Sequence, residues 1–315
     1  MSDALHNPVF RIYFAVLMGL LVFAGALLAI LRLALHKNVD HAWKAYRGWL
    51  IMIPPVFAAL LIGRLATIVF FTAVAIGAFI EFARATGLYR DWWMTSIVIL
   101  GITAVGVVSA IDDPDPAKHV HGWYGMLMAL PVYVVAAIMM IPILRDRAKG
   151  QLQPIALSVV GFVYIGWMFG HLSFLANAKN AYGYLLYLLF AVPLNDIAAF
   201  TFGRAFGKTK MRPNISPNKT WAGSIGALAV SMLLPWLVRF SFPGFGTTEL
   251  ILTGVIVGIG GQLGDLTISV MKRDIGIKDM GAVIEGHGGV LDRVDSLIYV
   301  APLFFHMARY FAGLS

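Results

Sequence analysis

The sequence predicts an all-α fold, a polytopic transmembrane helical bundle of about ten spans (nine to ten) with no soluble domain. Two observations lead to this prediction. The 315 residues are 59% hydrophobic and only 13% charged, whereas soluble domains carry about 25% charged residues. Apolar runs also recur along the chain at lengths close to the roughly 20 residues that a helix needs to cross a bilayer.

Ten apolar runs are the predicted spans, and short polar segments separate them. The first is too long for the core of a signal peptide and lacks a convincing cleavage site, so we interpret it as a retained span. The second contains Pro54 and Pro55 and is interpreted as a broken or re-entrant helix, because backbone groups freed by proline must be satisfied by protein. In chain order the predicted spans are 10–35, 48–63, 65–83, 92–110, 123–144, 154–175, 182–202, 221–240, 250–271 and 297–311.

The basic residues are divided unevenly between the two sets of connections. Most follow the odd-numbered spans, while the remaining connections hold little, namely Arg64, Lys118, Lys179 and Arg239. Lysine and arginine are enriched in cytoplasmic loops. This places the connections after the odd-numbered spans in the cytoplasm and both termini outside. The net charge of +8 therefore fits anionic headgroups or phosphate ligands, and no nucleic-acid partner is expected.

Polar and charged residues concentrate in the C-terminal half. We divide the chain into N-terminal transmembrane helices, residues 1–150, and a C-terminal transmembrane region, residues 151–315, which holds two cytoplasmic loops at 204–220 and 272–295. The chain contains no cysteine, and this excludes disulfides, thiolate nucleophiles and cysteine metal sites. A functional site is therefore expected at the two polar loops.

Acidic residues are scarce inside the predicted spans, so each one is informative. An ionised carboxylate in a bilayer is costly, and such residues are candidates for functional sites. Glu81 lies beside Arg84 near a helix end, and we interpret it as a helix-packing or interfacial acid. Asp196 and Asp265 each precede one of the two polar loops, and we interpret both as functional.

A polar stripe marks the helix that enters the second loop. Asp265, Ser269 and Lys272 share one helix face at 100° per residue, which stacks an acid, a hydroxyl and a cation toward the cytoplasmic end. Carboxylate oxygens suit Mg²⁺, and lysine and arginine suit phosphate. The stripe therefore predicts a site for a metal ion and a phosphate.

The second loop is dense in charge and in glycine. Gly286, Gly288 and Gly289 permit positive φ and allow backbone N–H groups to approach an anion. Asp292 and Asp295 are three residues apart and share a face at the start of the last helix. His287 and the neighbouring cations are candidate phosphate ligands, and the cations are Lys272, Arg273, Lys278 and Arg293.

The first loop contains a second phosphate candidate. Residues 203–209 resemble a P-loop, but three residues separate the glycines where that motif requires four, so a nucleotide P-loop is rejected. Residues 216–220 read Ser-Pro-Asn-Lys-Thr. Here Thr220 is expected to cap the next helix, whose free N–H groups attract anions, and Lys219 adds a cation.

The stretch 269–295 resembles the signature of the phosphatidate cytidylyltransferases, the CDP-diacylglycerol synthases. The matching residues are Ser269, Lys272-Arg273, Lys278-Asp279, His287-Gly288-Gly289 and Asp292-Arg293-Val294-Asp295. Asp196 and the run 216–220 are similar to the second conserved region of that family. Ala222 stands where the family usually has Glu, and Glu285 stands where it usually has Pro or Gly, which leaves room for a divergent paralogue.

The resemblance implies a nucleotidyltransferase of phospholipid biosynthesis that makes CDP-diacylglycerol and pyrophosphate from CTP and phosphatidate. The expected catalytic residues are Asp265, Lys272, Asp279, Asp292 and Asp295. The expected substrate-binding residues are Ser216, Lys219, Thr220, Ser269, Arg273, Lys278, His287 and Arg293. The expected Mg²⁺ ligands are Asp265, Asp292 and Asp196, with a second cation left open.

The expected partners are CTP, phosphatidate and the membrane, with a homodimer left open. We expect a bacterial inner membrane with the active site facing the cytoplasm. One alternative is a CTP-dependent polyprenol or phytol kinase, which would release CDP. Another is an ion-coupled transporter that uses Asp196 and Asp265, and a third is an inactive paralogue that serves as a binding partner.

Overall fold

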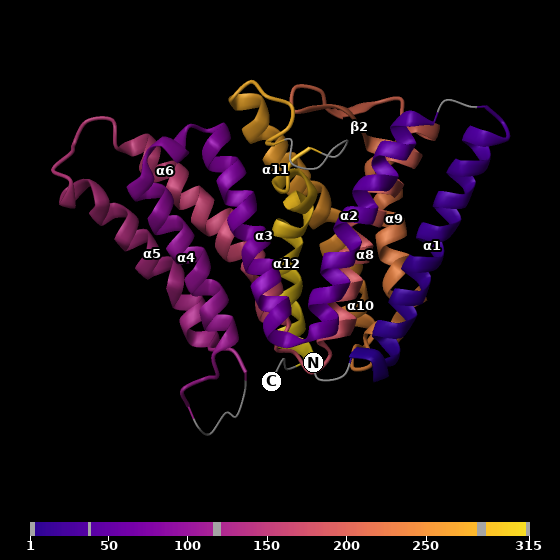
Figure 1. The fold of residues 1–315 in the computed structure, drawn as a ribbon, viewed down its shortest axis with the longest axis horizontal. Helices are drawn as coiled ribbons and strands as arrows, with labels where there is room; N and C mark the ends of the chain where they lie inside the picture. The colour runs from indigo at the N-terminus through magenta and orange to yellow at the C-terminus, as the bar shows by residue number, and fades with distance from the viewer. Residues whose placement is uncertain (1–3, 37–38, 116–120, 282–287, 313–315) are drawn as a thin grey trace.

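The computed structural model describes residues 4–36, 39–115, 121–281 and 288–312 and consists almost entirely of helices (Figure 1). The α-helices are α1 (Pro8–Leu33), α2 (Asp40–Ile62), α3 (Arg64–Ala85), α4 (Trp92–Ala110), α5 (Tyr124–Leu144), α6 (Leu152–Val160), α7 (Phe169–Leu175), α8 (Ala181–Phe206), α9 (Trp221–Leu237), α10 (Thr247–Val255), α11 (Gly261–Asp274) and α12 (Leu291–Ala312). Two π-helices, η3 (Gly161–Met168) and η5 (Ile256–Gly260), join α6 to α7 and α10 to α11. Three short 3₁₀ helices are η1 (Ala4–His6), η2 (Leu88–Arg90) and η4 (Arg239–Ser241).

The predicted all-α transmembrane bundle is confirmed, and the chain is an integral membrane protein. Eight helical segments of the described residues are long and apolar enough to cross a bilayer. The other two predicted spans correspond to α9, which has 17 residues, and to α12, which begins with charged residues. The count of nine to ten spans therefore stays a prediction.

The second predicted span differs from expectation. Helix α2 begins at Asp40 and continues without interruption through Pro54 and Pro55 to Ile62, so the predicted break is wrong. Transmembrane helices tolerate proline where neighbouring groups or local adjustments satisfy the freed backbone carbonyls.

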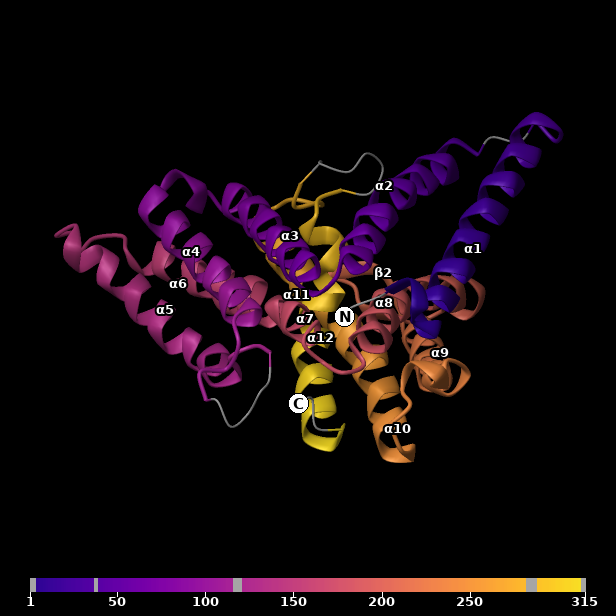
Figure 2. The same cartoon turned by 60° about the horizontal axis from the view of Figure 1, so that its bottom comes forward.

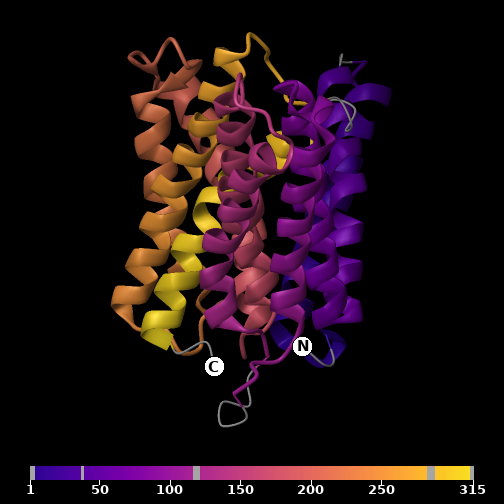
Figure 3. The same cartoon turned by 90° about the vertical axis from the view of Figure 1, so that its left-hand side faces the viewer.

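The connections separate into two sets at opposite ends of the bundle. Figures 1 and 3 place both termini at one end, and the segments that follow α8 and α11 at the other. The connections α3–α4 and α5–α6 lie at this second end as well. The basic connections thus share one end, as the alternation of spans predicts, and we refer to it as the basic end.

The buried centre of the bundle lies around α7, all of whose residues are buried. Figure 2 shows α7 between the α3–α6 group and the C-terminal helices, and it contacts α3, α4, α8 and α12. In contrast, α1 exposes most of its apolar side chains, as expected for a helix that faces lipid. The site-bearing helices are therefore held by central packing, and the peripheral helices supply the lipid-facing surface.

One strand pair interrupts the helical architecture at the basic end. Strands β1 (Lys210–Arg212) and β2 (Ser216–Thr220) form a two-stranded antiparallel sheet. Pro217 suggests a turn within the run 216–220, but the structure shows this run as a strand. The sheet fixes β2 against the start of α9, where Trp221 N–H donates to the Thr209 carbonyl at 3.1 Å.

Candidate active site

A cavity of about 310 Å³ lies among the polar ends of α8, β2, α9, α11 and α12. Its lining is unusually rich in charge for a membrane protein, with five carboxylates and three cationic side chains. The lining residues are Asp196, Ala199, Phe200, Ser216, Asn218, Lys219, Thr220, Gly223, Ser224, Gln262, Asp265, Lys272, Asp279, Asp292, Arg293 and Asp295. We refer to it as the acidic cavity.

Asp265 lies at the centre of one set of contacts in the acidic cavity. Its Oδ2 is 2.6 Å from Lys219 Nζ, which reaches across from β2, and its Oδ1 accepts a hydrogen bond of 3.3 Å from Ser269. Lys219 also donates to the Gln262 carbonyl at 3.3 Å. The predicted stripe of Asp265, Ser269 and Lys272 is therefore present, and Lys219 joins it from another element.

Asp292 forms the second set of contacts. Its Oδ1 accepts a hydrogen bond of 2.8 Å from Lys272 Nζ, and this pair is buried. Its Oδ2 accepts from the Met280 and Gly289 N–H groups at 2.9 and 3.0 Å. Gly288 has a φ of +81°, which glycine adopts without the steric penalty of a side chain. Asp292 therefore closes the second loop onto the start of α12.

Glu81 has a role that the sequence did not indicate. It lies in α3 and is only 7% exposed, and its two oxygens accept hydrogen bonds of 2.9 and 2.8 Å from the N–H groups of Val290 and Leu291. A carboxylate at this position satisfies free N–H groups at the start of α12 and suits the helix dipole. The earlier interpretation as a packing acid beside Arg84 therefore missed a contact that spans 209 residues.

These contacts revise the expectation for the glycine-rich loop. The described backbone N–H groups of Met280, Gly289, Val290 and Leu291 all donate to the protein's own carboxylates. In this structure they hold the loop in place, so the predicted role of the loop backbone as an anion ligand has no support at these four positions. Gly286 and His287 lie outside the described residues, as does Glu285.

Close helix packing brings the acids together. A Cβ on Gly264 would lie 2.5 Å from the Asp295 carbonyl oxygen and 2.8 Å from the Ser296 Cα, so α11 and α12 cross in near contact at this glycine. The crossing places Asp265 next to the face that bears Asp292 and Asp295. On the other side, Gly223 of α9 packs on the Ala199 carbonyl of α8, which brings the α9 N-terminus close to Asp196.

The acidic cavity gathers most of the predicted site residues but not all of them. The predicted residues that line it are Asp196, Ser216, Lys219, Thr220, Asp265, Lys272, Asp279, Asp292, Arg293 and Asp295. Ser269 and Arg273 do not line the cavity. Ser269 donates a hydrogen bond to Asp265, and Arg273 donates to the Ile215 carbonyl at 3.2 Å. Lys278 is exposed and lies outside the lining. As predicted, Thr220 caps α9, because its hydroxyl accepts from Gly223 N–H at 3.2 Å.

Three lining residues with polar side chains were missed as site candidates. Gln262 bonds Ser224 through its side chain, which also donates to the Gly258 carbonyl at 2.7 Å, and Asn218 lies in β2 beside Lys219. Gln262 precedes Asp265 by three residues, so the polar stripe of α11 already contained the signal for it. Ser224 follows the cap Thr220 by four residues and was recognisable in the same way.

The donor set of the acidic cavity fits a divalent cation. No group of three or more metal-binding side chains is preassembled in the part of the chain that the structure describes, but Mg²⁺ is usually held by one or two carboxylates together with waters and substrate phosphates. The five lining carboxylates outnumber the three cationic side chains. Asp196 is exposed to the cavity and forms no ion pair within the described residues, so it is available as a ligand.

Comparisons with known proteins cover most of the chain. A family model described as "Cytidylyltransferase family" matches residues 43–311, a range that contains every lining residue of the acidic cavity. A phosphatidate cytidylyltransferase of Staphylococcus haemolyticus is 36% identical over 183 residues, 58% of this chain and 69% of that protein. One of Staphylococcus aureus (strain COL) is 34% identical over 204 residues, 64% of this chain and 76% of that protein.

Another similar protein has no activity in its description. The "Uncharacterized protein YnbB" of Escherichia coli (strain K12) is 36% identical over 164 residues, which is 49% of this chain. The matched segment spans only 55% of that protein's length.

Proposed function

Because the chain belongs to the cytidylyltransferase family, we propose that it transfers the cytidylyl group of CTP to phosphatidate, forming CDP-diacylglycerol and pyrophosphate. The observation that best supports this reaction is the acidic cavity, where cationic and acidic side chains from separate helices meet at the polar end of a transmembrane bundle. The names of the staphylococcal relatives point to the same substrates.

The reaction joins two anions, so charge neutralisation and positioning are the main tasks of the site. A phosphate oxygen of phosphatidate bonds to the α-phosphorus of CTP. The bond between that phosphorus and the oxygen bridging to the β-phosphate breaks, and pyrophosphate leaves with this oxygen. A phosphate monoester is already largely ionised near neutral pH, so the proposal assigns no general base.

The lysines of the acidic cavity are suited to hold the phosphates. Lys219 and Lys272 are paired with Asp265 and Asp292 at 2.6 and 2.8 Å, and both lysines line the cavity. In the proposal, Lys219 exchanges its carboxylate partner for a CTP phosphate, while Lys272 remains on Asp292. The exposed guanidinium of Arg293 is free to reach the second phosphate.

We assign Mg²⁺ to Asp265 and Asp196, with Asp292 as a further ligand. When Lys219 leaves Asp265 for a phosphate, an Asp265 oxygen becomes free. Asp292 Oδ1 accepts one hydrogen bond, from Lys272, and therefore keeps a lone pair. The chemistry that a bound Mg²⁺ supplies is neutralisation of the phosphate charge as pyrophosphate leaves.

The lipid substrate is expected to approach along α8. Phe200 lines the acidic cavity and is 68% exposed, and its neighbour Ile197 is exposed on the same helix. An apolar surface that continues into a charged cavity allows acyl chains to stay in the bilayer while the phosphate enters. We also place the basic end in the cytoplasm of a bacterial inner membrane, following the positive-inside rule.

The product released from CTP tests the proposal. Purified protein in lipid vesicles is supplied with Mg²⁺ and with CTP labelled in the α- or the γ-phosphate, together with phosphatidate or a polyprenol. The proposal predicts α-label in the lipid and γ-label in pyrophosphate, with phosphatidate only. Appearance of γ-label in a polyprenol, with CDP released, would identify a lipid kinase instead.

A further inference from the structure

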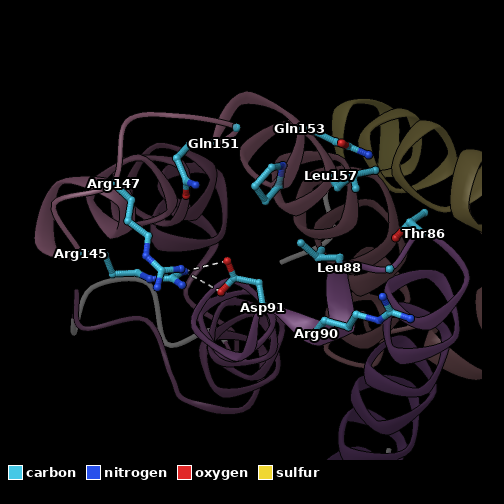
Figure 4. Close-up of a pocket in the computed structure, with 12 residues that line it drawn as sticks. Thr86, Leu88, Arg90, Asp91, Arg145, Arg147, Gln151, Gln153 and Leu157 are labelled. Carbon is cyan, nitrogen blue, oxygen red and sulfur yellow. Dashed lines mark hydrogen bonds and ion pairs between the residues drawn. The ribbon is translucent and has the colours of Figure 1, made fainter.

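A second cavity of about 400 Å³ lies at the basic end, among the ends of α3, α4, α5 and α6 (Figure 4). It shares no lining residue with the acidic cavity, and none of its residues belongs to the sequence motifs described above. Its polar lining residues include Thr86, Arg90, Arg145, Arg147, Gln151 and Gln153. We refer to it as the arginine cavity.

The arginine cavity has an excess of positive charge. Arg145 Nη1 lies 2.8 and 2.7 Å from the two oxygens of Asp91, so this half-buried pair neutralises itself. Arg90 and Arg147 are exposed, and neither forms an ion pair with any residue that the structure describes. Figure 4 shows Arg147 beside the Arg145–Asp91 pair, with Arg90 across the cavity. Each of these two guanidinium groups is therefore free to bind an anion on its own side of the cavity, and guanidinium matches the geometry of phosphate oxygens.

Gln151, which also lines the cavity, has an unsatisfied hydrogen-bond acceptor. Its amide N–H₂ donates to the Lys149 carbonyl at 3.1 Å, while its Oε1 is buried without a partner in the described structure. Buried polar atoms are normally hydrogen-bonded. A ligand that offers a hydroxyl group beside its phosphate would satisfy this oxygen.

Exposed apolar residues adjoin lining residues of the arginine cavity along the chain. Ile143 and Leu144 precede Arg145 directly, and Leu152 follows Gln151, and all three are strongly exposed, Leu152 at 81%. These residues terminate α5 and begin α6, two segments that are apolar enough to cross the membrane. The guanidinium groups thus lie at the boundary between bilayer and water, where basic pockets between transmembrane helices bind anionic headgroups.

From these observations we infer that the arginine cavity binds a phosphate group that belongs to a molecule with a hydroxyl near the phosphate. A phospholipid headgroup of the phosphatidylglycerol type and soluble glycerol phosphate share this chemistry. The exposed apolar residues nearby favour the lipid, because only the lipid has acyl chains to lie on Ile143, Leu144 and Leu152. The site is independent of the proposed transfer reaction.

Equilibrium binding to the purified full-length protein in a neutral detergent tests the inference. The two probes are short-chain phosphatidylglycerol and glycerol phosphate, and bound ligand is counted by native mass spectrometry. The test variant is the double substitution Arg90→Gln with Arg147→Gln. Loss of two charge-assisted contacts is expected to weaken lipid binding by about tenfold or more. Lipid held in the acidic cavity would be unaffected by this variant.

Arg84→Gln is the matched control. Arg84 is an exposed arginine at the same end that stacks over Tyr89 at 5.0 Å and lies outside the cavity lining, so its loss is expected to leave binding unchanged. The charge-conserving pair Arg90→Lys with Arg147→Lys is expected to bind more tightly than the glutamine pair. Glycerol phosphate that binds as tightly as the lipid, with the same loss, would support the site and assign it a soluble ligand. Equal lipid binding by wild type and the glutamine pair would overturn the inference.

Discussion

The carboxylates near the acidic cavity serve two different purposes. Glu81 and Asp292 accept backbone N–H groups and fix the second loop and the start of α12. Asp265 and Asp196 accept from no backbone N–H of the residues that the structure describes, and both line the acidic cavity. Substitution of the two kinds should therefore have different consequences for stability and for turnover.

Asp265→Asn and Asp292→Asn are each expected to lower Mg²⁺-dependent turnover by about 100-fold or more, as when charge stabilisation of a transition state is removed. Asp292→Asn should also lower the midpoint of thermal unfolding, because an amide nitrogen cannot accept the bonds that Lys272 or the loop N–H groups donate. Asp265→Asn should unfold at nearly the wild-type temperature. Near-normal turnover in either variant contradicts the metal assignment.

Glu81→Gln is expected to destabilise the protein by about 2 kcal/mol, because one charge-assisted hydrogen bond to the start of α12 is lost. Turnover should fall as the second loop loosens, although Glu81 lies outside the cavity lining. Glu249→Gln, at the start of α10, is the matched control and should change neither quantity. An unfolding temperature equal to wild type in Glu81→Gln would show that the cap is dispensable.

Ala222→Glu restores the residue that is usual in the family and is expected not to reduce turnover. Ala222 lies in the first turn of α9, is half-buried and does not line the acidic cavity. A carboxylate near a helix N-terminus is favourable. Turnover is compared with wild type under saturating CTP and phosphatidate. A large loss would mean that this site has come to require the small residue.

At the scale of elements, the crossing of α11 and α12 determines whether the acids meet. Gly264→Ala would place a methyl group against the backbone of Asp295 and Ser296, and overpacking of this kind costs about 1–3 kcal/mol. Stability and turnover are both expected to fall. Gly77→Ala, in α3, meets nothing within 4 Å and should be neutral. Equal behaviour of the two variants would show that the crossing is not tight.

Much of the helical arrangement could be predicted from the sequence, because membrane spans have a characteristic length and polar stripes follow the helical repeat. The stripe of Asp265, Ser269 and Lys272 lies within one helix, so spacing alone predicts its shared face. The hydrogen bonds between Glu81 and the start of α12 depend on how α3 packs against α12. No local sequence pattern predicts that packing. The β1–β2 pair was missed for a similar reason, because Pro217 and a short polar run suggest a turn.

The whole molecule has a basic end, which holds both cavities, and an opposite end, which holds both termini. The cysteine-free sequence permits single-cysteine labelling of each end. Pro114→Cys, between α4 and α5, is expected to react with an impermeant maleimide in intact cells. Lys208→Cys, after α8, should react only after permeabilisation. The opposite labelling pattern would reverse the proposed orientation.

The placement of nucleotide and cation is best tested by a structure determined with CTP, Mg²⁺ and the intact chain. We expect the triphosphate inside the acidic cavity, with Lys219 on a phosphate oxygen and the cation in contact with Asp265. Nucleotide bound anywhere else, or a cation that touches none of the five lining carboxylates, would contradict it.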